Sequence, residues 1–214
     1  LAHDEAILFG CALPTGSGMV LNEVQPFEGS SVVVLGLGGV GLSALMALKV
    51  FNCSKVIAID VSDEKLALAL DLGATHIINP VRDNVNELIS NLTNGGVDNC
   101  IESAGTVETI ELGFSLIRMR GGKLLFASHP PEVDKIAISP FDLISGKQIT
   151  GSWGGASRPD YDIPRLYEVL QSTNAPLKKL ISKSYRLDEI NEALNDLEAG
   201  CVFRPLIEMQ HKLS

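Results

Sequence analysis

The sequence predicts an α/β fold, in which a doubly wound parallel sheet is followed by a helical tail at the C-terminus. Two observations carry this prediction. Short apolar runs alternate with helical patterns between residues 31 and 128. These runs lack the polar alternation of a strand with one face in water, which is typical of strands buried on both faces. Strands and helices that alternate in this way connect by right-handed crossovers and form a parallel sheet.

Five segments are predicted to be strands, because each is a short run rich in valine, isoleucine, leucine or phenylalanine. They are 31–36 (SVVVLG), 55–60 (KVIAID), 76–79 (HIIN), 98–103 (DNCIES) and 123–128 (KLLFAS). The intervals between them are long enough for each crossover to contain a helix.

The helical pattern at 62–74 shows how these crossovers are built. Ser62 is placed to cap the N-terminus of the helix, because its hydroxyl can accept a backbone N–H of the first turn. One face of the helix is predicted to consist of Leu66, Ala69, Leu70 and Gly73. Gly73 also ends the helix, since glycine readily adopts the left-handed conformation found after helix ends.

The pattern changes after residue 150. Segment 151–164 (GSWGGASRPDYDIP) is predicted to be a loop, because Pro159 and Pro164 break regular elements. An amphipathic helix is expected at 165–171. A second helix is indicated by four apolar residues at helical spacing, and Gly200 is its predicted end. These four residues are Leu187, Ile190, Leu194 and Leu197.

A cluster of glycines lies in the segment 31–45 (SVVVLGLGGVGLSAL), between a predicted strand and a predicted helix. Its GxGxxG pattern consists of Gly36, Gly38 and Gly41, with Gly39 and Val40 between the last two. Gly36 allows a sharp turn, Gly38 leaves room for a pyrophosphate, and Gly41 lets the helix approach the strand closely. The helix N-terminus offers unpaired N–H groups and about half a positive charge to an anion. We interpret the loop as a dinucleotide-binding site rather than a plain glycine turn.

Asp60 ends the next predicted strand, where a carboxylate can accept hydrogen bonds from both hydroxyls of an adenosine ribose. NADP carries a phosphate on this ribose, and a carboxylate about 4 Å from one phosphate charge costs about 4 kcal/mol at an effective dielectric constant of about 20. Asp60 therefore favours NAD. FAD enzymes and S-adenosylmethionine methyltransferases also use such loops, but the former are usually longer chains with an N-terminal loop, and the latter bind no pyrophosphate.

The composition restricts the partners. A net charge of -9 disfavours nucleic acids and anionic membrane surfaces, because both would repel the protein. No apolar run approaches the roughly 20 residues that span a bilayer, and no segment resembles a signal peptide. The cysteines form no CxxC pair and are expected to be reduced, with Cys53 and Cys100 as core residues. We therefore expect a cytoplasmic protein that binds a small molecule.

Six stretches together form a specific pattern: LFGCALPTGSG, VLGLGGVGLSAL, IAIDVSDEKLALALDLGATHIINP, GGVDNCIESAG, GSWGGASRPDYDIPRL and LDEINEALNDLEAGCVFR. Through them the sequence from Glu5 to Met209 resembles the cofactor-binding and C-terminal part of zinc-dependent medium-chain alcohol dehydrogenases, the branch that includes glutathione-dependent formaldehyde dehydrogenase. The resemblance implies a Rossmann fold, NAD and zinc as cofactors of the full-length protein, and an alcohol or aldehyde as substrate.

The same resemblance implies contacts along the whole dinucleotide. Asp60 and Lys65 would hold the adenosine ribose, and Arg204 would meet the pyrophosphate. Thr15 and Val40 would border the nicotinamide. Backbone groups near three further residues would bind the nicotinamide carboxamide. These residues are Ala127, Ser152 and Gly154.

Cys11 is the candidate metal ligand, because in the family the cysteine of GC...TG is the third protein ligand of the catalytic zinc. From the residues alone a buried cysteine remains the alternative, since one thiolate cannot define a tetrahedral site. The family's other ligands, its proton-relay residues and its structural zinc cluster belong to an N-terminal domain that has no counterpart in this sequence. The predicted parts are 1–12, a remnant of the catalytic domain; 13–155, the dinucleotide-binding domain; and 156–214, a segment returning to the catalytic domain.

The sequence thus predicts the NAD(H)-binding domain of an NAD-dependent, zinc-dependent alcohol or aldehyde oxidoreductase, inactive as this chain alone. The alternative is a nucleotide-binding or self-associating module with no chemistry of its own. The resemblance also implies a homodimer, in which the segment 139–153 (SPFDLISGKQITGSW) lies at the edge of the sheet and pairs with its twofold mate.

Overall fold

A computed structural model of the chain describes residues 3–127 and 129–209. The chain forms two compact units. Unit 2 spans Cys11–Ala175, and unit 1 combines Leu1–Gly10 with Pro176–Ser214. The three parts predicted from the sequence, 1–12, 13–155 and 156–214, stay a prediction, and residues 1–2, 128 and 210–214 of them lie outside the described residues.

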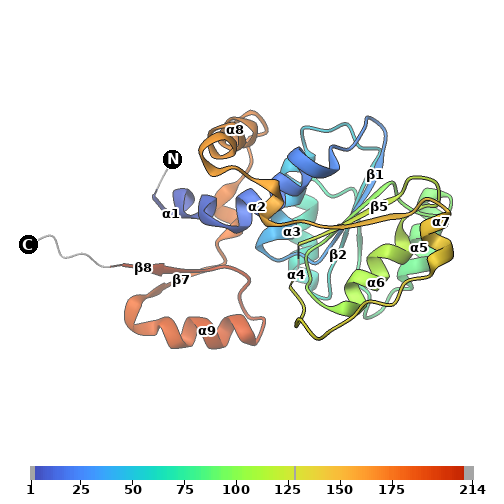
Figure 1. Cartoon of the computed structure of the whole chain (residues 1–214). Coiled ribbons are helices and arrows are strands. Elements are labelled where there is room, and N and C mark those ends of the chain that lie inside the picture. The colour runs from blue at the N-terminus through green and yellow to red at the C-terminus, as the bar shows by residue number, and fades with distance from the viewer. Residues whose placement is uncertain (1–2, 128, 210–214) are drawn as a thin grey trace, which may run out of the picture. The chain divides into compact units, whose positions relative to one another are not determined.

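Unit 2 is built on a six-stranded sheet with the order β3-β2-β1-β4-β5-β6 (Figure 1). The strands are β1 Ser31–Leu35, β2 Lys55–Ile59, β3 His76–Ile78, β4 Asn99–Glu102, β5 Lys123–Phe126 and β6 Gln148–Gly151. All five pairings are parallel. The five predicted strands and the doubly wound parallel sheet are therefore confirmed, although residue 128 of the predicted strand 123–128 lies outside the described residues. Strand β6 lies at the edge, as the resemblance implies.

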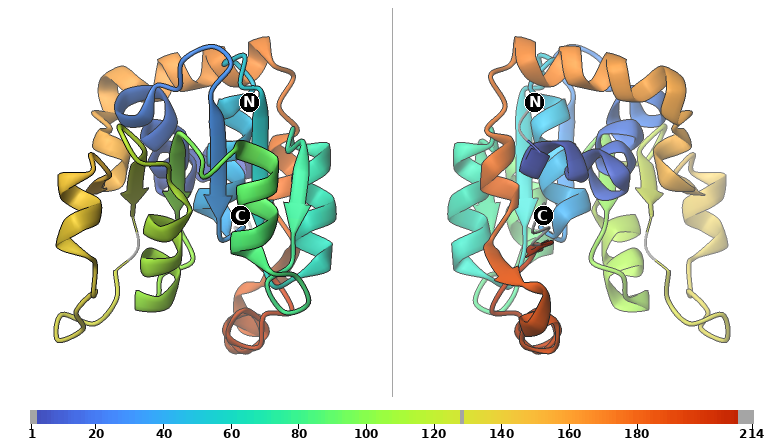
Figure 2. Two further views of the ribbon diagram at one scale, coloured as in Figure 1. Left: turned by 90° about the vertical axis from the view of Figure 1, so that its right-hand side faces the viewer. Right: turned by 90° about the vertical axis from the view of Figure 1, so that its left-hand side faces the viewer.

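Helices cover both faces of this sheet. The helical elements of unit 2 are α2 Ala12–Gly18, the π-helical segment η2 Met19–Val24, α3 Gly39–Leu48, α4 Asp63–Asp71, α5 Val85–Thr93, α6 Val107–Leu116, α7 Pro140–Ile144, the 3-10 turn η3 Gly154–Ala156 and α8 Pro159–Ser172. In Figure 2, α5 and α6 face the viewer on the left, and α2 and α3 face the viewer on the right. The core under α6 joins Val33, Ile57 and Cys100 of the strands to Ile110 and Phe114. Strand β1 is buried along its whole length, as the unbroken apolar run predicts.

Helix α4 begins and ends as predicted. The Ser62 hydroxyl accepts a backbone N–H of the first turn, and Gly73 follows the helix with φ 112°. Leu66 and Ala69 are buried, but Leu70 is 46% exposed. The prediction that Leu70 belongs to the buried face is wrong, because α4 meets the sheet along a narrower stripe than the i, i+3, i+4 pattern covers.

Helix α8 starts at Pro159 and continues through Pro164, so the prediction of a loop up to residue 164 is wrong. Pro159 lies in the first turn, where its missing N–H has no intrahelical partner in any case. Pro164 removes one internal hydrogen bond, which costs about 3 kcal/mol. The burial of Leu166 and Leu170 offsets this cost by removing two large apolar side chains from water.

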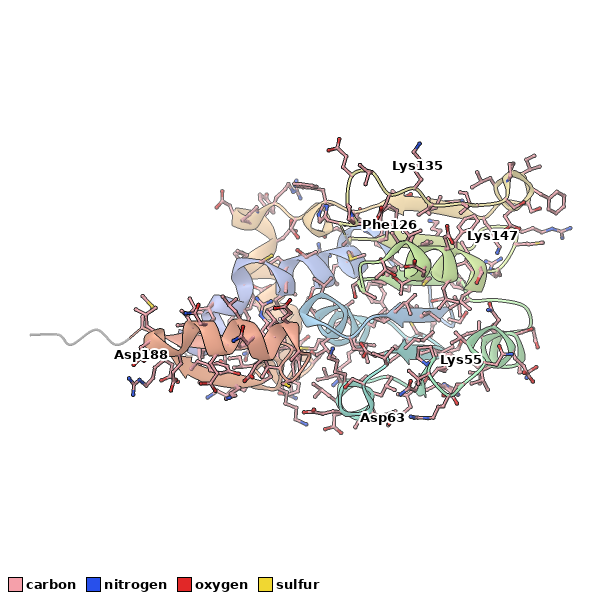
Figure 3. The ribbon with its side chains drawn as sticks, turned by 90° about the horizontal axis from the view of Figure 1, so that it is seen from below. Lys55, Asp63, Phe126, Lys135, Lys147 and Asp188 are labelled. Carbon is pink, nitrogen blue, oxygen red and sulfur yellow. The ribbon has the colours of Figure 1, made fainter. Side chains whose placement is uncertain are left out.

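Edge strand β6 is preceded by a buried lysine, Lys147, which is only 9% exposed. Its Nζ donates to the carbonyls of Phe114 at 3.1 Å and Ser115 at 3.3 Å, at the end of α6. A positive charge is stabilising there, because the C-terminal end of a helix is negative. Figure 3 shows Lys147 and Phe126 near α6, whereas Lys55 and Asp63 lie on the opposite side of unit 2. Lys147 therefore ties the edge of the sheet to α6.

Unit 1 contains a small parallel sheet, so the predicted helical tail also includes strands. Its elements are α1 His3–Ala6, η1 Ile7–Gly10, η4 Leu177–Leu180, β7 Lys183–Arg186, η5 Leu187–Glu189, α9 Ile190–Glu198 and β8 Pro205–Glu208. Its core consists of Tyr185, Ala193 and Val202, packed by Ile207. The apolar residues predicted to line the second helix remain between 42% and 55% exposed. Gly200 ends α9 with φ 72°, as predicted.

The four cysteines are free thiols. Cys100 is buried and Cys53 is half-buried, in line with their interpretation as core residues, and burial raises the pKa of both thiols. No single helix among the described residues is long and apolar enough to cross a membrane, and only the bent pair Asp4–Gly10 and Ala12–Val24 reaches that length and composition together.

Candidate nucleotide-binding site

The GxGxxG loop lies at the carboxyl end of β1, between β2 on one side and β4 on the other. The chain proceeds outward from β1 to β3 in one direction and from β4 to β6 in the other. Such a reversal opens a crevice at the carboxyl ends of the strands, where open α/β sheets bind their ligands. The topology therefore places the loop in the expected crevice.

Two glycines of the loop are required by close packing. Gly36 has φ 88°, and a Cβ there would lie 2.5 Å from the backbone N of Ala104. A Cβ on Gly41 would lie 1.9 Å from the carbonyl oxygen of Gly36. The Ser103 hydroxyl donates to the same carbonyl at 2.8 Å. These contacts are the sharp turn and the close helix approach that the pattern predicts.

Gly38 has a different reason to be glycine. Its φ of -76° is open to any residue, and a Cβ there would meet no atom within 4 Å. Gly38 is the N-cap of α3, and the first N–H groups of any helix, here those of Gly39 and Val40, have no intrahelical partner. Because glycine has no side chain, Gly38 does not cap these N–H groups either. A side chain at Gly38 would occupy open space at the start of this helix. That space and those donors together fit a pyrophosphate.

Asp60 links the glycine loop to the next crossover. It is 9% exposed, and its two carboxylate oxygens accept N–H groups from Leu37 at 2.7 Å and Ser62 at 2.9 Å. Each carboxylate oxygen has a second lone pair, so the group can still accept hydrogen bonds from a ribose. Lys65 lies in the first turn of α4, close in sequence to this carboxylate.

The loop after β4 closes the other side of the crevice and is organised by a buried acid, Glu102. Its Oε1 accepts the N–H groups of Ala104 and Gly105 and the hydroxyl of Thr109, each at 2.8 Å. Glu102 is fully buried, and these donors compensate the loss of water around its carboxylate. The loop they hold is the one that packs on Gly36.

An open cavity of about 220 Å³ lies beside Asp60. Its walls are mostly apolar and include Val61 and Leu112. Glu108 stands at its rim, where hydrogen bonds from its own backbone N–H and from the Thr106 hydroxyl lower the pKa of its carboxyl. A flat, largely apolar base such as adenine suits such a cavity.

Thr15 and Val40 meet because α2 packs on the beginning of α3. A Cβ on Gly16 would lie 2.0 Å from the carbonyl oxygen of Val40. The Thr15 hydroxyl donates to the Cys11 carbonyl at 2.9 Å, which fixes it at the start of α2. The two residues predicted to border the nicotinamide are thus neighbours.

The three residues predicted to bind the carboxamide follow β5 and β6. These strands pair in parallel, so Ala127 and Ser152, which come directly after them, lie next to each other. Gly154 begins the turn η3. A Cβ on Gly155 would lie 2.3 Å from the Thr15 carbonyl oxygen. The turn after β6 therefore packs against α2, and the predicted nicotinamide residues come together at one end of the crevice.

The structure leaves the roles of two predicted residues, Cys11 and Arg204, untested. Cys11 is exposed just before α2, and the described residues contain no group of three or more His, Cys, Asp or Glu side chains able to hold a metal ion. These residues therefore do not form a zinc site by themselves. Arg204 belongs to unit 1, where it lines a cavity of about 290 Å³ with Phe203 and Leu206. Its contact with the pyrophosphate stays a prediction.

Sequence reasoning missed Glu102 and the apolar wall of the cavity. A signal for the first exists, because Glu102 is an acid inside an apolar predicted strand. The sequence signal for the second is weaker: Val61 is an apolar residue that directly follows Asp60, and the structure shows it to be 66% exposed. Neither Glu102 nor Val61 can be assigned to the site from the sequence alone, because the assignment requires knowing that the carboxyl ends of β2 and β4 face one crevice.

Comparisons with known proteins agree with this geometry. Residues 39–172 match the family described as zinc-binding dehydrogenase. The chain is 30% identical over 209 residues to alcohol dehydrogenase 2 of Zea mays, covering 97% of the chain and 55% of that protein. It is 35% identical over 202 residues to alcohol dehydrogenase class-2 isozyme 2 of Oryctolagus cuniculus, and this match covers 94% of the chain and 53% of that protein. The chain spans about half the length of these curated relatives.

Solved structures show the same likeness. The crystal structure of benzyl alcohol dehydrogenase from Acinetobacter calcoaceticus matches with a TM-score of 0.92 and 34% identity, over 98% of this chain and 58% of that one. An alcohol dehydrogenase zinc-binding domain protein from Burkholderia ambifaria matches with a TM-score of 0.88 and 34% identity, over 94% of this chain and 54% of that one. The residues that match the family include α3, Asp60 and the turn after β6. The chain therefore belongs to the zinc-binding dehydrogenase family.

Proposed function

We propose that the chain is the NAD(H)-binding domain of an NAD-dependent, zinc-dependent alcohol or aldehyde oxidoreductase. The observation that carries this proposal is the open space at Gly38, which is the N-cap of α3 and directly follows Leu37, whose N–H donates to Asp60. Family membership and the alcohol dehydrogenases among the relatives support it. The resemblance to the glutathione-dependent formaldehyde dehydrogenase branch stays a prediction.

The residues of the crevice divide the work along the dinucleotide. The α3 N–H groups bind the pyrophosphate, Asp60 and Lys65 bind the adenosine ribose, and the cavity beside Val61 takes the adenine. Backbone groups near Ala127, Ser152 and Gly154 bind the carboxamide and thereby orient the nicotinamide ring. When bound, NAD supplies the acceptor for a hydride from the alcohol carbon. The chain's own residues therefore bind and orient the cofactor.

The first prediction concerns cofactor choice. The chain is expected to bind NAD(H) at least tenfold more tightly than NADP(H), because the Asp60 carboxylate repels the additional phosphate. Calorimetric titration with both cofactors measures the ratio. Asp60→Ala is expected to lower the ratio of NAD(H) affinity to NADP(H) affinity, because it weakens NAD(H) binding and removes the repulsion of the additional phosphate of NADP(H). Equal affinities for the unmodified chain would contradict the proposal.

A second prediction concerns the metal. We propose Cys11 as one ligand of a catalytic zinc whose other ligands lie in the part of the relatives that this chain does not span. A catalytic zinc needs three protein ligands and one open position. We therefore expect this chain to hold less than stoichiometric zinc and to form no NADH from alcohol, as measured by elemental analysis and absorbance. Stoichiometric zinc with steady turnover would contradict the proposal.

The same two measurements on a longer protein that contains the remaining ligands separate the alternative function. A nucleotide-binding module without chemistry of its own would stay inactive even in a longer protein that contains the remaining ligands. The proposed oxidoreductase would gain turnover there. The exposed leucines of α9 support the proposal that unit 1 belongs with the catalytic domain, since exposed apolar residues at one helix mark a contact surface.

A third prediction concerns association. We propose a homodimer in which β6 pairs with its twofold mate, because β6 leaves the edge of the sheet open. Phe141 and Ile144 of the adjoining α7 are 65% and 82% exposed, which supports a contact there. Light scattering at micromolar concentration is expected to give twice the chain mass of 22.9 kDa, and Ile144→Asp is expected to reduce it. A single species at the monomer mass would count against the dimer.

The remaining proposals concern the protein's location in the cell, its substrate and its partners. Free thiols on all four cysteines support a cytoplasmic location. The proposed substrate is a small alcohol or aldehyde, and no nucleic acid or membrane partner is proposed. Fractionation of cells that express the protein is expected to recover it with cytoplasmic enzymes.

A further inference from the structure

The turn that follows β6 is held by a hydrogen-bond relay which begins at Glu23. The Ser152 hydroxyl donates to Glu23 Oε2 and accepts the Gly155 N–H at 3.1 Å. Ser152 is 7% exposed. Glu23 lies on η2, a segment far from Ser152 in the sequence. The relay therefore fixes the turn after β6 to a helical element on one face of the sheet.

One further hydrogen bond fixes the same turn to the same element, and a second one holds the side chain that makes it. The Asn22 side-chain amide donates to the Gly155 carbonyl at 3.1 Å, and Arg165 of α8 donates to the Asn22 side-chain oxygen at 3.0 Å. A Cβ on Gly18 would lie 2.4 Å from the Gly155 carbonyl oxygen. Gly155 is thus held through both its N–H and its carbonyl, so the plane of each adjoining peptide is defined.

The carboxylate of Glu23 determines how the Ser152 hydroxyl is used. A hydroxyl has one proton to donate and two lone pairs, whereas an ionised carboxylate only accepts. The Ser152 hydroxyl therefore donates its hydrogen bond to Glu23, which leaves its lone pairs to accept the Gly155 N–H. Hydrogen bonds with an ionised partner are about twice as strong as neutral ones. Glu23 consequently fixes the rotamer of Ser152 and, through it, the turn.

The turn fixed in this way leaves two of its backbone groups available to a ligand. In the part of the chain that the structure describes, the Ser152 carbonyl and the Gly154 N–H have no hydrogen-bond partner. An acceptor and a donor two residues apart match the NH₂ and the C=O of a primary carboxamide. Their spacing is maintained by the contacts of Gly155.

We propose that Glu23 is a positioning residue for the nicotinamide half of the cofactor. Acting through Ser152, it holds the Ser152 carbonyl and the Gly154 N–H where a carboxamide can bind both. The inference rests on the proposed function, which assigns the carboxamide to this turn. Glu23 is not part of the adenosine half, where Asp60 and the α3 N-terminus bind the ligand.

The test compares two ligands that differ only in the nicotinamide riboside end. ADP-ribose contains the adenosine and the pyrophosphate, and NADH contains the carboxamide as well. Calorimetry is performed on the full chain and on Glu23→Ala. We expect roughly tenfold weaker NADH binding for Glu23→Ala, the equivalent of one charge-assisted hydrogen bond, with ADP-ribose binding unchanged.

Two variants complete the design. Glu23→Gln keeps an oxygen acceptor for Ser152 and is expected to restore most of the NADH affinity. Glu28→Ala removes an exposed acid near β1 and is expected to leave both affinities unchanged. ADP-ribose binding in each sample also reports whether the crevice is folded.

The outcomes are distinguishable. If Glu23→Ala binds NADH as tightly as the unmodified chain, the inference is overturned while the proposed function stands. If Glu23→Ala binds neither ligand, a second variant is measured: Ser152→Ala, which removes the same relay by deleting one oxygen atom. Equal loss of NADH and ADP-ribose affinity in Ser152→Ala also overturns the inference. If the unmodified chain binds neither ligand, the proposed function fails, and the inference fails with it.

Discussion

Replacing Gly38 with valine is expected to reduce NADH affinity by a factor on the order of 100 or more, while the thermal midpoint of unfolding stays unchanged. The backbone at Gly38 has φ -76°, which valine adopts without strain, and a Cβ there meets no protein atom within 4 Å. The group that the valine side chain would displace is the pyrophosphate that we propose to bind at the α3 N-terminus. Each hydrogen bond to a charged group contributes about 1.5–3 kcal/mol, so losing two of them gives a loss of this size.

Calorimetry with NADH and thermal unfolding on the same sample measure both effects. Gly38→Ala is the graded control, because its smaller side chain fills less of the space and is expected to weaken binding less. Unchanged NADH affinity for Gly38→Val would show that the pyrophosphate does not lie at the loop. A large fall in the thermal midpoint would instead show that Gly38 is required for packing.

Gly41→Ala is expected to have the opposite profile and to destabilise unit 2 by about 3 kcal/mol. The added Cβ would lie 1.9 Å from the Gly36 carbonyl oxygen and 2.8 Å from the Ser103 hydroxyl. Backbone cannot move away as a flexible side chain can, so α3 must separate from β1. For a domain of this size the thermal midpoint falls by roughly 6–12 °C.

Differential scanning calorimetry of Gly41→Ala beside Gly38→Ala measures this contrast, since both substitutions add the same methyl group to one loop. Equal midpoints for the two variants would mean that the helix and strand are not in the close contact described. The pair also separates the two reasons for glycine in the loop, one of packing and one of ligand access.

The glycine loop and Asp60 could be predicted from the sequence because their requirements are local. A sharp turn, a close helix approach and a carboxylate at a strand end depend on residues a few positions apart. The parallel sheet could also be predicted, because strands buried on both faces leave an unbroken apolar run such as Val32 to Leu35.

Elements that depend on tertiary packing were mispredicted. Pro164 is incompatible with an isolated helix, yet α8 includes it because Leu166 and Leu170 bury their side chains in unit 2. Leu70 fits the helical period but not the stripe that meets the sheet. Local propensity is a weak guide wherever packing over longer distances decides the outcome.

The residues that we propose to bind the nicotinamide could be predicted only through the family resemblance. Thr15, Val40 and Ser152 come from three separate segments, and no local pattern connects them. Their proximity follows from the packing of α2 on α3 and from the pairing of β5 with β6. Glu23 had no sequence signal at all, because a single acid in an apolar helix has no periodic or spaced partner.

The most direct measurement uses the single tryptophan of the chain, Trp153, which lies between Ser152 and Gly154 and is 83% exposed. If the dinucleotide extends from Asp60 to this turn, bound NADH places its reduced nicotinamide near Trp153. We predict that titration with NADH quenches Trp153 fluorescence and produces nicotinamide emission by energy transfer, and that ADP-ribose reverses both. Unchanged Trp153 fluorescence at saturating NADH would contradict the proposed site.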